Sequence, residues 1–131
     1  MGVRYLLDTH VLLWLLGDAE RVPEPVRADL ADPGVTLLVS AASALEVATK
    51  QRLGRLDVGD LVDVWARRVA EIGGTELPVG ADHALLAGRL GWDHRDPFDR
   101  LLVAQAVVEN ATLVTVDARV RAYGRAAVLT W

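Results

Sequence analysis

The stretch HRDPFDRLLVAQAVV, residues 94–108, begins with charged residues and ends in an apolar run. Asp96 followed by Pro97 predicts a helix start, with an N-cap aspartate and proline at the first helical position. On a helical wheel that starts at Pro97, apolar side chains surround the helix almost completely, which predicts a helix buried on most sides. A second aspartate, Asp99, then lies one turn into this buried helix. A carboxylate in such a place is costly to desolvate unless it is paired.

On either side of this helix, the chain alternates between strand-like and helix-like segments. Short apolar runs predict strands at residues 3–7, 35–40, 75–79, 112–116 and 127–131. Helical spacing and stop signals predict helices at residues 10–16, 23–32, 41–53, 60–72, 81–90 and from 97 onward. Strands that are apolar throughout and alternate with helices indicate a parallel sheet that is covered on both faces. We therefore predict a three-layer α/β fold.

Composition limits the class of protein. A chain of 131 residues is about one domain, which we place at residues 1–131. Hydrophobic residues make up 52% and charged residues 24%, as in a folded globular protein. The absence of cysteine excludes disulfides, thiolate metal sites and cysteine nucleophiles. No apolar run approaches the roughly 20 residues that span a bilayer, so we expect a cytoplasmic protein without a membrane partner.

The net charge of −4 gives no overall basic signal for nucleic acid. A polyanionic substrate therefore needs a local basic patch or a bound metal ion to attract it. Several arginines follow the acidic residues along the chain, and Arg100, the neighbour of Asp99, is the first candidate for a phosphate contact. For each arginine alone, a solvated surface charge is the simpler interpretation.

Two predicted strands end in aspartate: YLLD at Asp8 and VTVD at Asp117. Ligands of open parallel sheets bind beyond the carboxyl ends of the strands. Either aspartate alone would be interpreted as a cap of the following helix, whereas two at the same edge favour a site. Glu46 leaves two interpretations open. It forms a capping box with Ser43, or, if the helix starts at Ser40, it lies one turn further in.

Asp99 is the most informative acid, because its burial is best explained by a cation shared with other carboxylates. Arg95 and Arg100 are the alternative partners. The candidate ligands are carboxylate oxygens, the chain has no cysteine, and its three histidines do not have the spacing of a zinc motif. These features favour Mg²⁺ or Mn²⁺ over Zn²⁺. An acid cluster that holds Mg²⁺ suits phosphoryl transfer to water.

Four segments, taken in order, resemble the PIN-domain nucleases and, within them, the VapC-type toxins of bacterial toxin–antitoxin systems. They are LLDTHVLLWLL (6–16), SAASALEVATKQRLGRL (40–56), HRDPFDRLLVAQA (94–106) and LVTVDARVRAYG (113–124). The resemblance implies a parallel sheet of four to five strands ordered 3-2-1-4-5. It also implies a Mg²⁺-dependent endoribonuclease that acts on RNA, forms a homodimer and is neutralised by a small cognate antitoxin.

The resemblance carries over to particular residues. It assigns catalysis and metal binding to Asp8, Glu46, Asp99 and Asp117, with hydroxyl groups near the metal from Thr9 and Thr115. Asp96 is expected to cap its helix and to lie close enough to orient Asp99. One departure is Leu45, where relatives often carry a tryptophan before the glutamate; we interpret it as repacking.

Other classes remain open. The LLDTHV segment is similar to the first strand of haloacid-dehalogenase phosphatases, but the second acid of that motif and its later lysine are missing. The chain lacks the paired acids after the first strand and the late lysine that a receiver domain needs. It also has no glycine-rich phosphate loop. A non-catalytic PIN-like module that binds RNA or protein, and a structure-specific DNA nuclease, are the alternatives that experiments must separate.

Overall fold

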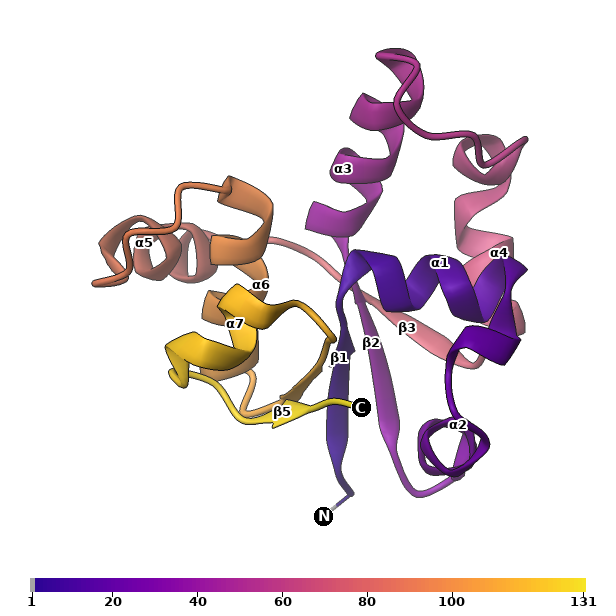
Figure 1. Cartoon of the computed structure of the whole chain (residues 1–131), viewed down its shortest axis with the longest axis horizontal. Helices are drawn as coiled ribbons and strands as arrows, with labels where there is room; N and C mark the ends of the chain where they lie inside the picture. The colour runs from indigo at the N-terminus through magenta and orange to yellow at the C-terminus, as the bar shows by residue number, and fades with distance from the viewer. Residues whose placement is uncertain (1) are drawn as a thin grey trace.

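The computed structural model describes residues 2–131 and contains a five-stranded sheet within them (Figure 1). The strands are β1 (Arg4–Leu7), β2 (Thr36–Ser40), β3 (Gly74–Leu77), β4 (Thr112–Val114) and β5 (Val128–Leu129). They pair in parallel in the order β3-β2-β1-β4-β5, which confirms the predicted fold and strand order. Parallel pairing brings the carboxyl ends of all these strands to one edge of the sheet.

Helices cover both faces of the sheet. They are α1 (Thr9–Gly17), α2 (Glu24–Ala31), α3 (Ala41–Arg52), α4 (Trp65–Glu71), α5 (Ala81–Arg89), α6 (Pro97–Val108) and α7 (Ala118–Tyr123). Helices α1, α2 and α4 lie on one side of the sheet and α5, α6 and α7 on the other, while α3 extends from the end of β2 (Figure 1). Among the helices of residues 2–131, none combines the length and apolar composition needed to span a bilayer.

Two apolar cores form because adjacent strand residues point to opposite faces of the sheet. Leu6 packs in the core beneath α5, α6 and α7, whereas its neighbour Leu7 packs in the core beneath α1, α2 and α4. Leu113 and Val114 divide between the two cores in the same way. The buried strand residues that face these two cores are therefore apolar, which explains the apolar runs in the sequence.

Several predicted elements differ from the structure: the strands expected over residues 75–79 and 127–131 are shorter, and two further differences have a local cause. The helix expected over residues 60–72 is divided into a 3-10 turn, Leu61–Val64, and α4, because Val64 has a non-helical φ of −124°. The strand expected over residues 112–116 ends at Val114. Asp117 therefore does not end the strand, since Thr115 and Val116 form a connection that leads into α7.

Buried Gln105 fixes α6 against the carboxyl edge of the sheet. Its side-chain carbonyl accepts a hydrogen bond from the Ser40 hydroxyl at the end of β2 (2.5 Å), and its amide donates to the Pro78 carbonyl after β3 (3.2 Å). Ser40 also caps α3, because its hydroxyl accepts the Ala42 N–H. A single polar side chain thus sets the position of α6 relative to two strand ends.

Arg100 fixes the connection between α5 and α6. Its guanidinium donates hydrogen bonds, at 2.7–3.0 Å, to one carbonyl of the last turn of α5, Ala87, and to three of the connection: Leu90, Trp92 and His94. These bonds use most of the five N–H donors of an arginine. The phosphate contact expected for Arg100 is therefore not supported, because the side chain satisfies the carbonyls of a loop.

We predict that Arg100→Ala lowers the free energy of unfolding by about 2–4 kcal/mol, because four carbonyls lose their donor. Arg100→Lys should recover little of this loss, since an ammonium cannot reproduce the planar fork. Denaturant titration measures both, with Arg89→Ala as the control at an exposed arginine of α5. Equal stability of the Arg100→Ala and Arg89→Ala variants would contradict this role.

Candidate metal centre

Asp8 lies at the end of β1, where its carboxylate faces the connection after β4. It precedes α1, yet its side chain makes no capping hydrogen bond. Instead, one carboxylate oxygen accepts a hydrogen bond of 2.5 Å from the Thr115 hydroxyl. The Thr115 hydroxyl in turn accepts the Asp117 N–H at 3.0 Å. Thr115 therefore links two of the predicted acids, which follows from the parallel pairing of Leu7 with Val114.

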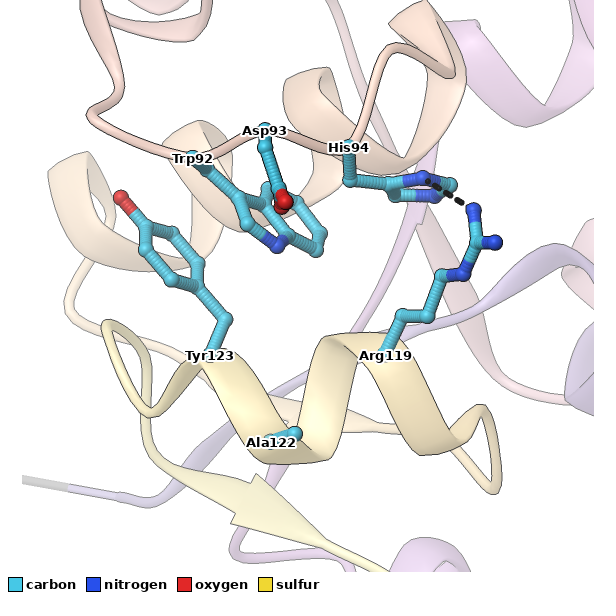
Figure 2. A pocket seen from close by; sticks show the side chains of 6 residues that line it. All are labelled: Trp92, Asp93, His94, Arg119, Ala122 and Tyr123. Carbon is cyan, nitrogen blue, oxygen red and sulfur yellow. Dashed lines mark hydrogen bonds between the residues drawn. The ribbon is translucent and has the colours of Figure 1, made fainter.

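Asp99 lies in the first turn of α6 and is paired with a histidine. The His94 Nε2 lies 2.7 Å from Asp99 Oδ2, and Arg119 Nη1 lies 3.0 Å from His94 Nδ1 (Figure 2). A guanidinium can only donate, so His94 Nδ1 accepts and its Nε2–H donates to the carboxylate. This chain of hydrogen bonds holds one oxygen of Asp99 in place.

Burial and mutual repulsion raise the pKa of two of these acids. Burial raises the pKa of Asp8, against the hydrogen bond from Thr115, and the Asp117 charge raises it further. Burial also raises the pKa of Asp99 to about 6, against the hydrogen bond from His94. The charges of Asp96, Asp8 and Asp117 add to that rise. Asp8, Asp99 and Asp117 are therefore close enough to interact electrostatically.

The basic side chains near these acids are histidines, His94 at Asp99 and His10 near Asp8. Within residues 2–131, no lysine or arginine forms an ion pair with Asp8, Asp99 or Asp117. Buried carboxylates are normally paired or bound to a metal ion. The donor set consists of oxygens and fits a hard divalent cation such as Mg²⁺.

Asp117 has a second, local role. One of its oxygens accepts the N–H groups of Arg119 and Val120, so it caps α7. The simple interpretation of this residue as a helix cap is thus satisfied. Its other oxygen makes no hydrogen bond within residues 2–131, which leaves it available to a cation.

Glu46 lies in the middle of α3, and its position resolves the two interpretations left open by the sequence. Because Ser40 caps the helix, Ser43 lies within it and cannot form the capping box. Glu46 is buried, pairs with Lys50 at 2.5 Å, and lines a small pocket with Thr9. The Thr9 hydroxyl hydrogen-bonds that of Ser43 at 2.9 Å. Glu46 therefore lies beside the residue that follows Asp8, but has Lys50 as a counter-ion.

The ligand atoms of His94, Asp96 and Asp99 all lie within 4.8 Å of one another, unlike the predicted set of four acids. Asp96 caps α6 as predicted, because one of its oxygens accepts the N–H groups of Phe98 and Asp99. The His94 Nε2 carries the proton that it donates to Asp99. We conclude that Asp96 and His94 orient Asp99, through its backbone N–H and its carboxylate respectively, and that the charges of Asp8 and Asp117 act on this carboxylate.

Sequence reasoning missed His94 as the partner of Asp99, for which it favoured a shared cation and gave Arg95 and Arg100 as alternatives. It also missed the contact of Arg119 with His94, and the role of Ser43 beside Thr9. The signal for His94 was local, since it opens the same motif, five residues before Asp99. Nothing in the sequence indicated that the loop would fold this side chain back over the helix.

Comparison with known proteins agrees with this architecture. Residues 5–126 match the PIN domain family. The ribonuclease VapC22 of Mycobacterium tuberculosis is 30% identical over 122 residues, which cover 90% of each chain. The chain belongs to the PIN-domain family and, within it, to the VapC type, as its motifs predicted.

Solved structures share the fold. The crystal structure of VapBC2 from Rickettsia felis, bound to a DNA fragment from its promoter, superposes with a TM-score of 0.72 and 17% identity. The match covers 98% of this chain and 99% of the other. FitAcB from Neisseria gonorrhoeae gives a TM-score of 0.65 and 22% identity, over 95% and 96% of the two chains.

The raised pKa of Asp99 predicts how stability depends on pH without metal. Because the folded state binds this proton more tightly, the free energy of unfolding should fall as pH rises from 3.8 to about 6 and then level off. Asp99→Asn lacks this titration. In EDTA, the free energy of unfolding of this variant, relative to that of the wild type, should rise by on the order of 2 kcal/mol across that pH range. Denaturation at several pH values measures this, and parallel profiles would contradict it.

Proposed function

We propose that this protein is a Mg²⁺-dependent endoribonuclease that acts as the toxin of a toxin–antitoxin pair in the cytoplasm. The observation that carries the proposal is the convergence of Asp8, Asp99 and Asp117, with which no lysine or arginine of residues 2–131 forms an ion pair. Such a site is unfavourable without a cation, and a divalent ion offsets the repulsion. The VapC22 relative, which is named a ribonuclease, supports the reaction class.

The acids of the site would bind the metal ion, and neighbouring residues would orient those acids. Asp8, Asp99 and Asp117 would hold the ion, and Glu46, which lies beside Thr9, would be a further ligand. Mn²⁺ should substitute for Mg²⁺. When bound, the metal neutralises phosphate charge and lowers the pKa of a water that attacks the phosphodiester. Thr115 orients Asp8 through its hydroxyl, and His94 orients Asp99 through Nε2. Both fix an oxygen of an acid before substrate arrives, which is how supporting residues tune a metal site.

We propose further that the protein pairs with a small antitoxin and forms a homodimer. The similarity to VapBC2 and FitAcB supports a protein partner. The site would be open to a lysine or arginine of that partner, because neither residue type of residues 2–131 pairs with Asp8, Asp99 or Asp117. A DNA nuclease is the competing activity, and comparison of RNA with DNA of the same sequence separates the two.

Asp99 and Asp96 provide the sharpest test of the metal mechanism. Asp99→Asn should fold, lose the rise in melting temperature that Mg²⁺ gives the wild type, and lower RNA cleavage by more than about a hundredfold. Asp96→Asn should keep most of the activity, because asparagine caps a helix about as well as aspartate. Cleavage of single-stranded RNA with Mg²⁺ or with excess EDTA measures this. Full activity in EDTA would overturn the metal mechanism, and equal inactivity of both variants would place Asp96 in the site.

The role as a toxin is tested in cells. Expression of the chain alone should arrest growth, and Asp117→Asn should relieve the arrest, because it removes one of the proposed metal ligands. Growth curves with matched protein levels measure the effect, and Asp29→Asn, at an exposed aspartate of α2, is the control that should still arrest growth. Growth arrest that persists in the Asp117→Asn variant would separate toxicity from the nuclease site.

A further inference from the structure

A pocket of about 470 Å³ opens between the loop before α6 and helix α7 (Figure 2). It is lined by Trp92, Asp93, His94, Arg119, Ala122 and Tyr123. In Figure 2, the two large aromatic rings lie on one side, His94 and Arg119 on the other, and Ala122 lies on α7 below. Its size is in the range of small-molecule sites.

The aromatic side of the pocket is rigid and preformed. The rings of Trp92 and Tyr123 are stacked, with centroids 4.5 Å apart and an interplanar angle of 4°. The ring of Trp92 also contacts that of His94 edge-on at 4.9 Å. Both rings pack against the core beneath α6, so they lose little freedom when a ligand arrives. Such aromatic surfaces stack unpaired bases of single-stranded nucleic acid.

The charged side chains determine how a nucleotide enters. Arg119 is exposed, and its guanidinium makes one hydrogen bond within residues 2–131, to His94, so its remaining donors are available to a phosphate. The carboxylate of Asp93 lies at the aromatic side (Figure 2). An ionised carboxylate only accepts hydrogen bonds, so it repels phosphate and favours an amino group. The base therefore enters beside Asp93, with its phosphate toward Arg119.

The pocket is continuous with the candidate metal centre through a single side chain. His94 forms part of the pocket and donates its Nε2–H to Asp99. A base held in the pocket would therefore place the adjoining phosphodiester close to the acids. An isolated surface cavity would not have this connection.

We infer that this pocket binds an unpaired RNA base with an exocyclic amino group, next to the bond that is cleaved. The identity of the ligand as RNA rests on the proposed function. Trp92 and Tyr123 supply the stacking surface, Asp93 accepts the amino group, and Arg119 contacts the phosphate. Cytosine and uracil differ at this amino group, so the pocket should prefer cytosine.

The test measures binding in EDTA, where cleavage cannot interfere. The probes are fluorescein-labelled oligocytidine and oligouridine, roughly twelve nucleotides long, and inorganic polyphosphate as a competitor without bases. Ala122→Leu fills the pocket from an exposed position and keeps a good helix former in α7. Ala28→Leu makes the same change at an exposed position of α2, on the other face of the sheet.

The wild type should bind oligocytidine more tightly than oligouridine. Ala122→Leu should weaken oligocytidine binding about tenfold and leave polyphosphate binding unchanged, whereas Ala28→Leu should change neither. Asp93→Ala should remove the preference for cytosine. Unchanged oligocytidine binding by Ala122→Leu, an equal loss of polyphosphate binding, or a preference that survives in Asp93→Ala would each overturn the inference. Failure of the proposed function would look different, because RNA would bind in this pattern but would not be cleaved with Mg²⁺.

Discussion

The desolvation of two carboxylates, Asp8 and Asp99, near the carboxyl edge of a parallel sheet is the constraint on which the rest of this structure depends. Parallel pairing places Asp8 beside the connection that carries Asp117, and α6 adds Asp99 from above the sheet. Burial raises the pKa of Asp8 and Asp99, so folding alone disfavours their charged forms. Thr115 and His94 reduce that cost by hydrogen bonding, but neither brings a fixed positive charge. A bound cation would complete the balance.

The start of α6 shows how neighbouring polar residues take different tasks. Asp96 satisfies the first N–H groups of the helix, Asp99 pairs with His94, and Arg100 holds the end of α5 and the following loop through four carbonyls. The loop that Arg100 holds also carries His94 to Asp99. The stability of this connection and the geometry of the acid are thus linked through one arginine that does not itself face the site.

The overall charge of −4 is compatible with a polyanionic substrate because attraction is local. The acids gather where a metal would bind. Arg119 is separated from Asp99 by His94, which hydrogen-bonds to both. The aromatic pair of Trp92 and Tyr123 offers a contact that does not depend on charge. His94 would then contact both the pocket that binds the base and the acid Asp99 of the catalytic site.

Local patterns in the sequence determined the layers of the fold and part of the site. Apolar runs that alternate with helices specified a covered parallel sheet, its order followed from the family resemblance, and Asp96–Pro97 fixed the start of α6, since a cap depends only on adjacent residues. The sequence also predicted which acids form the site, because carboxylates next to apolar segments are conspicuous. Only the tertiary structure decided their partners: His94 for Asp99, Thr115 for Asp8, Lys50 for Glu46, and loop carbonyls for Arg100. Side-chain partners depend on the path of loops and on distances between segments remote in the chain, and no local periodicity encodes either.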